Sequence, residues 1–136
     1  MNEEKPELSG LILAQDKTSH EDNILFTGEI YNLKFNADLT VLSACETGLG
    51  KISEGEGVIG LSRALIYAGT KNLMVSLWKV SDQSTSKLMI EFYTNLLKDK
   101  KGNSNSKHLR NAKLKLINES EYFHPFLWSP FILIGE

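Results

Sequence analysis

The fold is decided by one stretch of this 136-residue sequence, Leu39-Thr40-Val41-Leu42-Ser43-Ala44-Cys45-Glu46-Thr47-Gly48-Leu49-Gly50. Its first half is an apolar run typical of a buried strand, and its second half is a glycine-rich loop. Cys45, the single cysteine of the sequence, lies where the two halves meet. Because open α/β sheets bind their ligands at the carboxyl ends of strands, Cys45 is a candidate nucleophile. A free cysteine can equally be a small buried hydrophobic residue, and position alone favours neither interpretation.

The sequence on either side of this stretch predicts strands that alternate with helices. Strands are expected at residues 8–14, 39–45, 72–78 and 131–134. Helices are expected for one or two turns from Thr27, at 57–68, from Ser81 or Asp82 to about 98, and at 107–118. Thr27 is the expected cap of the first helix, and Gly69 ends the second. This order predicts an α/β fold, with a mostly parallel sheet and helices on both faces.

Composition and charge indicate one soluble globular domain. With 41% hydrophobic and 24% charged residues, the chain is long enough to bury a core. A net charge of -2 argues against nucleic acid and membranes as partners, and no apolar run approaches the ~18 residues of a membrane span. One cysteine excludes an internal disulfide, and the polar residues 1–7 are no signal peptide, so a cytoplasmic location is predicted. We expect residues 1–7 to be disordered.

Several motifs together resemble the CHAT domain, a caspase-like domain of bacterial proteins that is often preceded by tetratricopeptide repeats. In order, the motifs are Leu42–Gly50 with Gly55-Glu56-Gly57, Leu61-Ser62-Arg63-Ala64-Leu65 with Ala68-Gly69, Ser76-Leu77-Trp78-Lys79-Val80 with Asp82 and Thr85, Leu88-Met89 with Phe92-Tyr93, and His124-Pro125 with Trp128, Phe131 and Gly135. The resemblance covers about residues 7–136. It implies that residues 1–136 are part of one domain with a caspase-like three-layer sandwich, truncated at its N-terminus.

The resemblance also implies a cysteine endopeptidase with a Cys/His dyad, as in caspases and separases. Cys45 is then the nucleophile, whose sulfur attacks a peptide carbonyl to form an acyl-enzyme, and its backbone N–H forms part of the oxyanion hole. The implied partners are a protein or peptide substrate and tetratricopeptide repeats elsewhere in a parent protein. A non-catalytic, caspase-like interaction module is the alternative function, and a flavodoxin-like binding domain is disfavoured because its phosphate chemistry is missing.

The dyad histidine of the family has no counterpart in this sequence. In the family it comes just before the segment that matches Pro6–Gly10, so we expect this chain alone to have no peptidase activity. We expect His20 and His108 to be exposed, and His124 to lie in a structural turn with Pro125. The truncation would expose a sheet edge, through which we predict self-association.

Two acidic residues are candidates for substrate binding. Asp82 lies in a segment similar to the one that lines the pocket for a basic P1 residue in separases, and a carboxylate there can pair with arginine. The competing interpretation is that Asp82 is the N-cap of the helix that follows. Glu46 is a candidate for the same cleft, although its carboxylate would equally suit the amides of its own loop.

No cofactor and no metal are expected. The glycines of residues 48–57 allow tight turns around the thiol, but no Gly-Lys-Ser/Thr follows them, which disfavours a nucleotide site. One cysteine and three scattered histidines do not build a zinc site. Trp78 and Trp128 are expected in the core or in the wall of a cleft.

Overall fold

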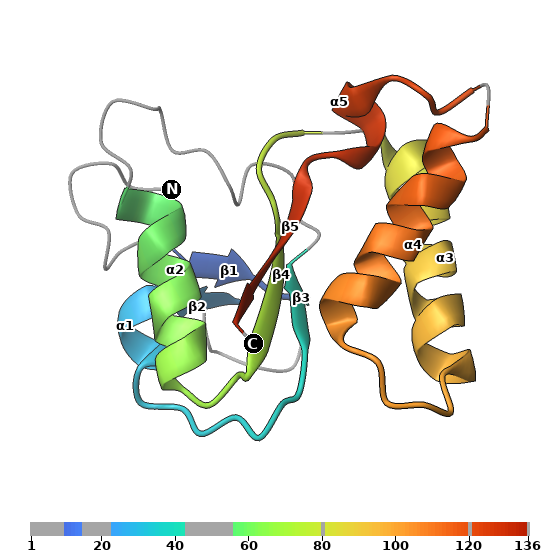
Figure 1. Ribbon diagram of the computed structural model, residues 1–136. Helices are drawn as coiled ribbons and strands as arrows, with labels where there is room; N and C mark the ends of the chain where they lie inside the picture. The colour runs from blue at the N-terminus through green and yellow to red at the C-terminus, as the bar shows by residue number, and fades with distance from the viewer. Residues whose placement is uncertain (1–9, 15–22, 43–55, 80, 120, 136) are drawn as a thin grey trace.

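The computed structural model describes residues 10–14, 23–42, 56–79, 81–119 and 121–135 (Figure 1). In chain order its elements are β1 (Gly10–Ile12), β2 (Ile24–Phe26), α1 (Thr27–Ile30), β3 (Thr40–Leu42), α2 (Glu56–Tyr67), β4 (Asn72–Ser76), α3 (Asp82–Lys98), α4 (Asn105–Ile117), α5 (Pro125–Trp128) and β5 (Phe131–Gly135). The predicted α/β class is confirmed. The expectation of disorder at residues 1–7 falls outside the described residues.

The three-stranded sheet has the order β3-β4-β5, with β4 in the centre. β3 runs parallel to β4, with Thr40 opposite Leu73, whereas β5 runs antiparallel to β4, with Phe131 opposite Ser76. The expected parallel direction is therefore right for β3 and wrong for β5. The reason is that two helices, α3 and α4, separate β4 from β5. Because α4 returns the chain along α3, β5 starts where β4 ends and must run back (Figure 1).

Side chains of β4 alternate between two cores, one on each face of the sheet. Leu73 and Val75 join a cluster formed mainly with α2, while Met74 joins a cluster formed with α3 and α4. This alternation follows from the two-residue period of a strand. Helices thus cover both faces, which confirms the predicted three-layer arrangement, with α1 and α2 on one side and α3 and α4 on the other (Figure 1).

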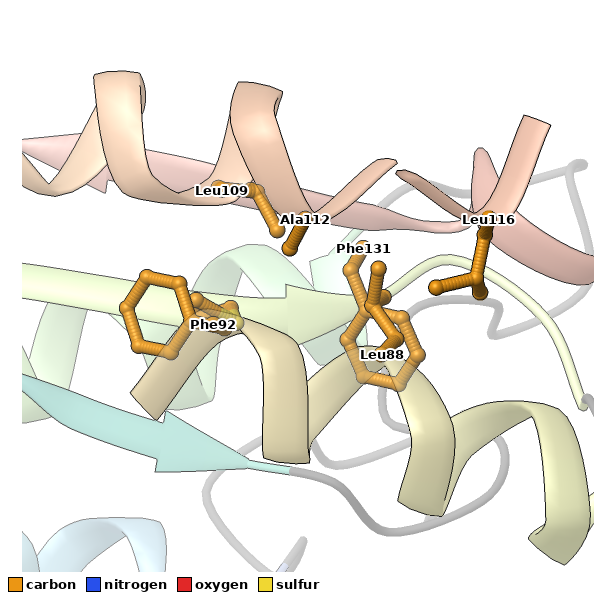
Figure 2. Packing of buried hydrophobic residues seen from close by; sticks show 7 residues of the cluster. Leu88, Phe92, Leu109, Ala112, Leu116 and Phe131 are labelled. Atoms are coloured by element: carbon orange, nitrogen blue, oxygen red, sulfur yellow. The ribbon is translucent and has the colours of Figure 1, made fainter. Parts of the chain in front are cut away.

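The larger buried side chains lie between α3, α4 and the sheet. Figure 2 shows this cluster, which consists of Met74, Leu88, Phe92, Leu109, Ala112, Leu116 and Phe131. Two ion pairs lie on the surface of this layer: Lys115–Glu91 at 2.6 Å joins α4 to α3, and Lys87–Glu119 at 3.4 Å joins α3 to the residues just after α4. The two helices therefore form one packed layer against the sheet. The chain leaves this layer after α4 and continues through α5 to β5.

Most predicted helices and strands are present, with ends shifted by a few residues. Gly69 ends α2 as expected and has a φ of 107°. Thr27 is the first residue of α1 rather than its cap, because the side chain of Glu29 accepts the N–H of Phe26 at 2.8 Å. Two short elements were not predicted: β2, which pairs antiparallel with β1, and α5.

Candidate functional site

The candidate site lies at the edge of the sheet where β3 and β4 both end. Leu42, the last residue of β3, is opposite Val75, and β4 ends one residue later at Ser76. Cys45 and Glu46 lie outside the described residues, as do the glycines between 48 and 55. The described part of this edge is the connection from β4 to α3, with Trp78 and Asp82, and it is the part from which a site can be built.

One hydrogen bond within the connection after β4, and one from it to the segment before β5, hold this connection in place. The buried hydroxyl of Ser76 donates to the carbonyl oxygen of Trp78 at 2.6 Å. The N–H of Leu77 donates to the carbonyl oxygen of Pro130 at 2.9 Å. These bonds use backbone groups that the end of the strand leaves free, and they fix the path of the chain towards α3.

Trp78 joins this connection to α5. Its indole Nε1–H donates to the carbonyl oxygen of Phe126 at 3.1 Å, and the two rings stack with centroids 5.8 Å apart. Trp128 donates in the same way to the carbonyl oxygen of Phe123, at 3.2 Å. Both tryptophans are partly buried against the α3–α4 core, as expected of core or cleft-wall residues.

Asp82 is exposed at the first position of α3 and does not cap the helix. The N-cap is Ser81, whose Oγ accepts the N–H of Ser84 at 3.2 Å. The alternative interpretation of Asp82 as the N-cap is therefore wrong. Its carboxylate still suits the positive end of the helix dipole, and the residue is exposed to solvent.

The two histidines that the structure describes, His108 and His124, lie in different environments. His20 lies outside the described residues. His108, expected to be exposed, is buried: its Nε2 lies 3.2 Å from Oδ2 of Asp99, at the junction of α3 and α4. This junction is at the opposite end of α3 from Asp82 (Figure 1). His124 lies in the expected turn, where its Nδ1 accepts the N–H of Phe126 at 3.2 Å and caps α5.

Sequence reasoning missed one polar group close to this edge, the amine of Lys113. Its Nζ reaches across from α4 and donates to the carbonyl oxygen of Phe131 at 2.6 Å and to that of Ser129 at 3.4 Å. Burial lowers the pKa of this amine. From the sequence, a lysine between Ala112 and Leu114 in a helix is predicted to have a solvated side chain. Its bonds to the carbonyl oxygens at the start of β5 become apparent only once the position of that strand is known. Phe126 was missed too, although Pro125 at the first position of a helix is a usable signal.

Within the described ranges, no group of three or more His, Cys, Asp or Glu residues is placed to hold a metal ion. None of the helices described is both long enough and apolar enough to cross a membrane.

Two curated mammalian proteins are similar in sequence to this chain. "Tetratricopeptide repeat protein 28" of Mus musculus is 28% identical over 113 residues, which is 82% of this chain. The protein of the same name from Homo sapiens is 29% identical over 116 residues, or 85% of this chain. The aligned region is 4% of the length of each relative, so the similarity concerns one small part of a long protein.

The family comparison covers the whole chain. The CHAT domain family matches residues 1–136, which include the motifs around the candidate site and the α3–α4 layer. The chain belongs to the CHAT domain family, a caspase-like family.

Proposed function

We propose that this chain is the C-terminal part of a caspase- and separase-like cysteine endopeptidase domain, with Cys45 as its nucleophile. The observation that carries the proposal is the parallel pairing of β3 with β4. Through this pairing, Leu42, three residues before Cys45, lies at the edge of the sheet where β4 also ends. The connection that leads from β4 to Asp82 starts at the same edge. Family membership supports the same assignment.

The proposed chemistry is acyl transfer. The thiolate of Cys45 attacks the carbonyl carbon of a peptide bond, and the tetrahedral intermediate expels the amine to leave a thioester. Water then hydrolyses the thioester, which releases the acid and restores the thiol. A cysteine with its ordinary pKa of about 8.5 is only a few per cent thiolate at neutral pH, so the reaction needs a nearby base.

We assign that base to a histidine outside this sequence. The two described histidines have other roles: His108 is buried against Asp99 at the far end of α3, and Nδ1 of His124 caps α5. Neither role suits a base that must come within about 2.6–3.2 Å of the thiol. Because neither described histidine suits this role, and because His20 is expected in an exposed loop, we expect the 136-residue chain alone to be inactive.

Asp82 is the proposed recognition group for a basic P1 residue of the substrate, with Glu46 as a second candidate in the same cleft. Asp82 is exposed, and the helix is capped by Ser81 instead, so its carboxylate is free to pair with an arginine. A planar guanidinium can make two hydrogen bonds to one carboxylate, which favours arginine over lysine.

The test uses the longer parent protein and a library of fluorogenic peptides that differ at P1. Cys45→Ala should abolish cleavage. Asp82→Asn should raise KM for arginine substrates by about tenfold or more, the usual cost of losing a charged hydrogen bond, and should change kcat less. Lys79→Gln, at an exposed position of the same connection, is the matched control. Cys45-dependent cleavage by the isolated chain would refute the assignment of the base.

The second candidate function is a non-catalytic interaction module. It is favoured by the absence, among the described residues, of a histidine free to serve as a base at the carboxyl edge of the sheet. Under this alternative, Cys45→Ala in the parent leaves both partner binding and the integrity of candidate substrates unchanged. Loss of cleavage with retained binding favours the peptidase.

We also propose that this chain belongs to a longer protein that contains tetratricopeptide repeats. The names of the two mammalian relatives support this, together with the small share of their length that the chain matches. A bacterial source and a cytoplasmic location stay predictions. Self-association is proposed through β3, which lies at an edge of the described sheet. A monomeric mass in light scattering over a wide range of concentrations would exclude it.

A further inference from the structure

The outward face of α3 carries an apolar stripe that the fold does not bury. Ile90, Tyr93 and Leu97 are spaced by three and four residues, so they lie on one side of the helix. Their side chains are 59%, 40% and 83% exposed. Single exposed apolar residues are ordinary, but three in helical register on one face are typical of an interaction surface.

This stripe lies opposite the face of α3 that packs on the core. Leu88 and Phe92 point inward and are fully buried. On the flank that faces α4, Glu91 forms an ion pair with Lys115 of that helix, and Lys87 forms one with Glu119, two residues beyond its end. The apolar positions of α3 therefore form two stripes, and only the inner one has a partner within the described fold. A helix that is apolar on opposite faces is typically covered on both.

The stripe ends in a strongly basic cluster. Lys98 closes α3, and Lys100 and Lys101 follow it, all three exposed. Residues 92–118 contain seven lysines and arginines and one acidic residue, Asp99, whereas the whole chain has a net charge of -2. The carboxylate of Asp99 is turned away into its own loop, where it accepts N–H groups of Lys101 and Asn103. Because three lysines outnumber this one carboxylate, the cluster keeps a net positive charge.

We propose that this surface, defined by Ile90, Tyr93, Leu97, Lys98, Lys100 and Lys101, binds an amphipathic acidic helix of a partner protein. Such a helix would lay apolar residues spaced by three and four along the stripe and place its acidic end against the three lysines. The charges fix the direction of the partner and speed its association, and the apolar contacts supply most of the affinity. Nucleic acid fits less well, because it would leave Ile90 and Leu97 uncovered and would meet a chain of net negative charge.

The surface is separate from the candidate peptidase site. Lys98 lies at the other end of α3 from Asp82, about 24 Å away at 1.5 Å per helical residue. Its occupation therefore does not depend on Cys45, and the proposal stands whether or not the domain cleaves peptides.

The test is fluorescence anisotropy with the 136-residue chain and synthetic labelled peptides. The peptides are helices of about 18 residues, or five turns, with leucines at three- and four-residue spacing and glutamates grouped at the N-terminal end in one and at the C-terminal end in the other. One of the two should bind, and more weakly as salt is raised. The control peptides carry lysine in place of glutamate and should not bind.

Two variants test the apolar and the charged part of the surface. Leu97→Asp should weaken binding about tenfold or more, as loss of an anchor residue does. The triple variant Lys98→Glu, Lys100→Glu and Lys101→Glu should do the same and should reverse the salt dependence, because salt then screens a repulsion between like charges. The matched controls are Leu13→Asp, an exposed leucine after β1, and Lys34→Glu, an exposed lysine after α1, and they should bind as the unaltered chain does. Circular dichroism confirms that each variant is folded.

Three outcomes would overturn the proposal. One is no saturable binding of either acidic peptide at concentrations up to about 1 mM, the weak limit of specific recognition. Another is equal affinity for the lysine peptides. The third is a dimer of the chain, without peptide, that Leu97→Asp dissociates, because the stripe would then be covered by a second copy.

Discussion

His108 faces Asp99 at the junction of α3 and α4, with Nε2 of the imidazole 3.2 Å from Oδ2 of the carboxylate and both side chains buried. The two groups are in close contact but are not aligned as a hydrogen bond. The carboxylate instead accepts N–H groups from Lys101 and Asn103. Asp99 is thus the central hydrogen-bond acceptor of the turn after which α4 returns along α3. The imidazole of His108, which belongs to α4, packs against the same carboxylate.

We predict that Asp99→Asn destabilises the fold at neutral pH and that the loss shrinks in acid. The pKa of the Asp99 carboxyl lies below its ordinary 3.8, mainly because the backbone N–H of Lys101 donates to it. The backbone and side-chain N–H groups of Asn103 and the charge of His108 lower this pKa further, whereas burial opposes the shift. A carboxyl whose pKa is lowered by folding stabilises the protein above its unfolded pKa, and that stabilisation is lost as the pH falls through its folded pKa. The difference in free energy of unfolding between variant and unaltered chain should therefore be full above about pH 5 and should decline below 3.8. Urea denaturation at a series of pH values measures it.

Asp38→Asn is the control for this experiment. Lys71 lowers the pKa of the Asp38 carboxyl by a hydrogen bond and by its charge, but both side chains are largely exposed. Its effect should be small and should vanish in about 1 M salt, where screening acts within about 3 Å. The effect of Asp99→Asn should persist in that salt, because it rests on hydrogen bonds within the turn and not on a charge pair at the surface. A constant difference across the pH range would show that the Asp99 charge does not stabilise the turn.

The two faces of α3 should respond differently to truncation. Phe92 is fully buried between α3, α4 and the sheet, so Phe92→Ala should cost about 3–5 kcal/mol of unfolding free energy. Ile90, two residues earlier, is mostly exposed, and Ile90→Ala should change stability by no more than about 0.5 kcal/mol. Thermal or urea denaturation of the pair measures this. Equal losses would mean that the outward stripe is buried in the isolated chain.

The turn from α2 into β4 should tolerate no side chain at Gly69. Its φ of 107° is strained for any other residue, and a Cβ there would overlap the carbonyl oxygen of Phe35. We expect Gly69→Ala to cost about 3 kcal/mol or more. Gly102→Ala is the matched variant, because Gly102 also has a positive φ, 67°, but nothing lies within 4 Å of the added carbon. It should cost about 1 kcal/mol, the strain alone. Similar losses of unfolding free energy at both sites would show that backbone strain, and not the contact with Phe35, causes the loss at Gly69.

The sequence was sufficient to predict the layers, because each long element carries one strong period. The unbroken apolar run Leu73, Met74 and Val75 predicts a strand buried on both faces, and the spacing of Leu88 and Phe92 predicts a helix. The direction of β5 was missed because it is set by the two helices before it, not by its own residues. β2 was missed because three residues, Ile24–Phe26, are too few to show a period, and their strand depends on pairing with β1.

The candidate site was predicted less completely than the fold. The edge at which β3 and β4 end follows from strand order, and Asp82 begins α3, the helix that follows β4, whereas its place in a substrate pocket stays a prediction. The burial of His108 was not foreseen, because a histidine among Lys107, Leu109 and Arg110 carries no local sign of the carboxylate of Asp99 that faces it. The stacking of Trp78 on Phe126 joins residues 48 positions apart, and such contacts have no signal in one sequence.

The roles of Ser81 and Asp82 can be separated by mutation, since stability and substrate binding fall on different residues. Ser81→Ala removes the Oγ that accepts the N–H of Ser84, so it should cost about 1 kcal/mol of unfolding free energy. Asp82→Asn removes only a charge near the helix N-terminus and should cost about 0.3–1 kcal/mol, less in high salt. If Asp82→Asn were the more destabilising change, its carboxylate would have a structural role, and any loss of arginine substrates in the parent protein would no longer point to the P1 pocket. If it is the milder change, a selective loss of arginine substrates can be assigned to the carboxylate itself.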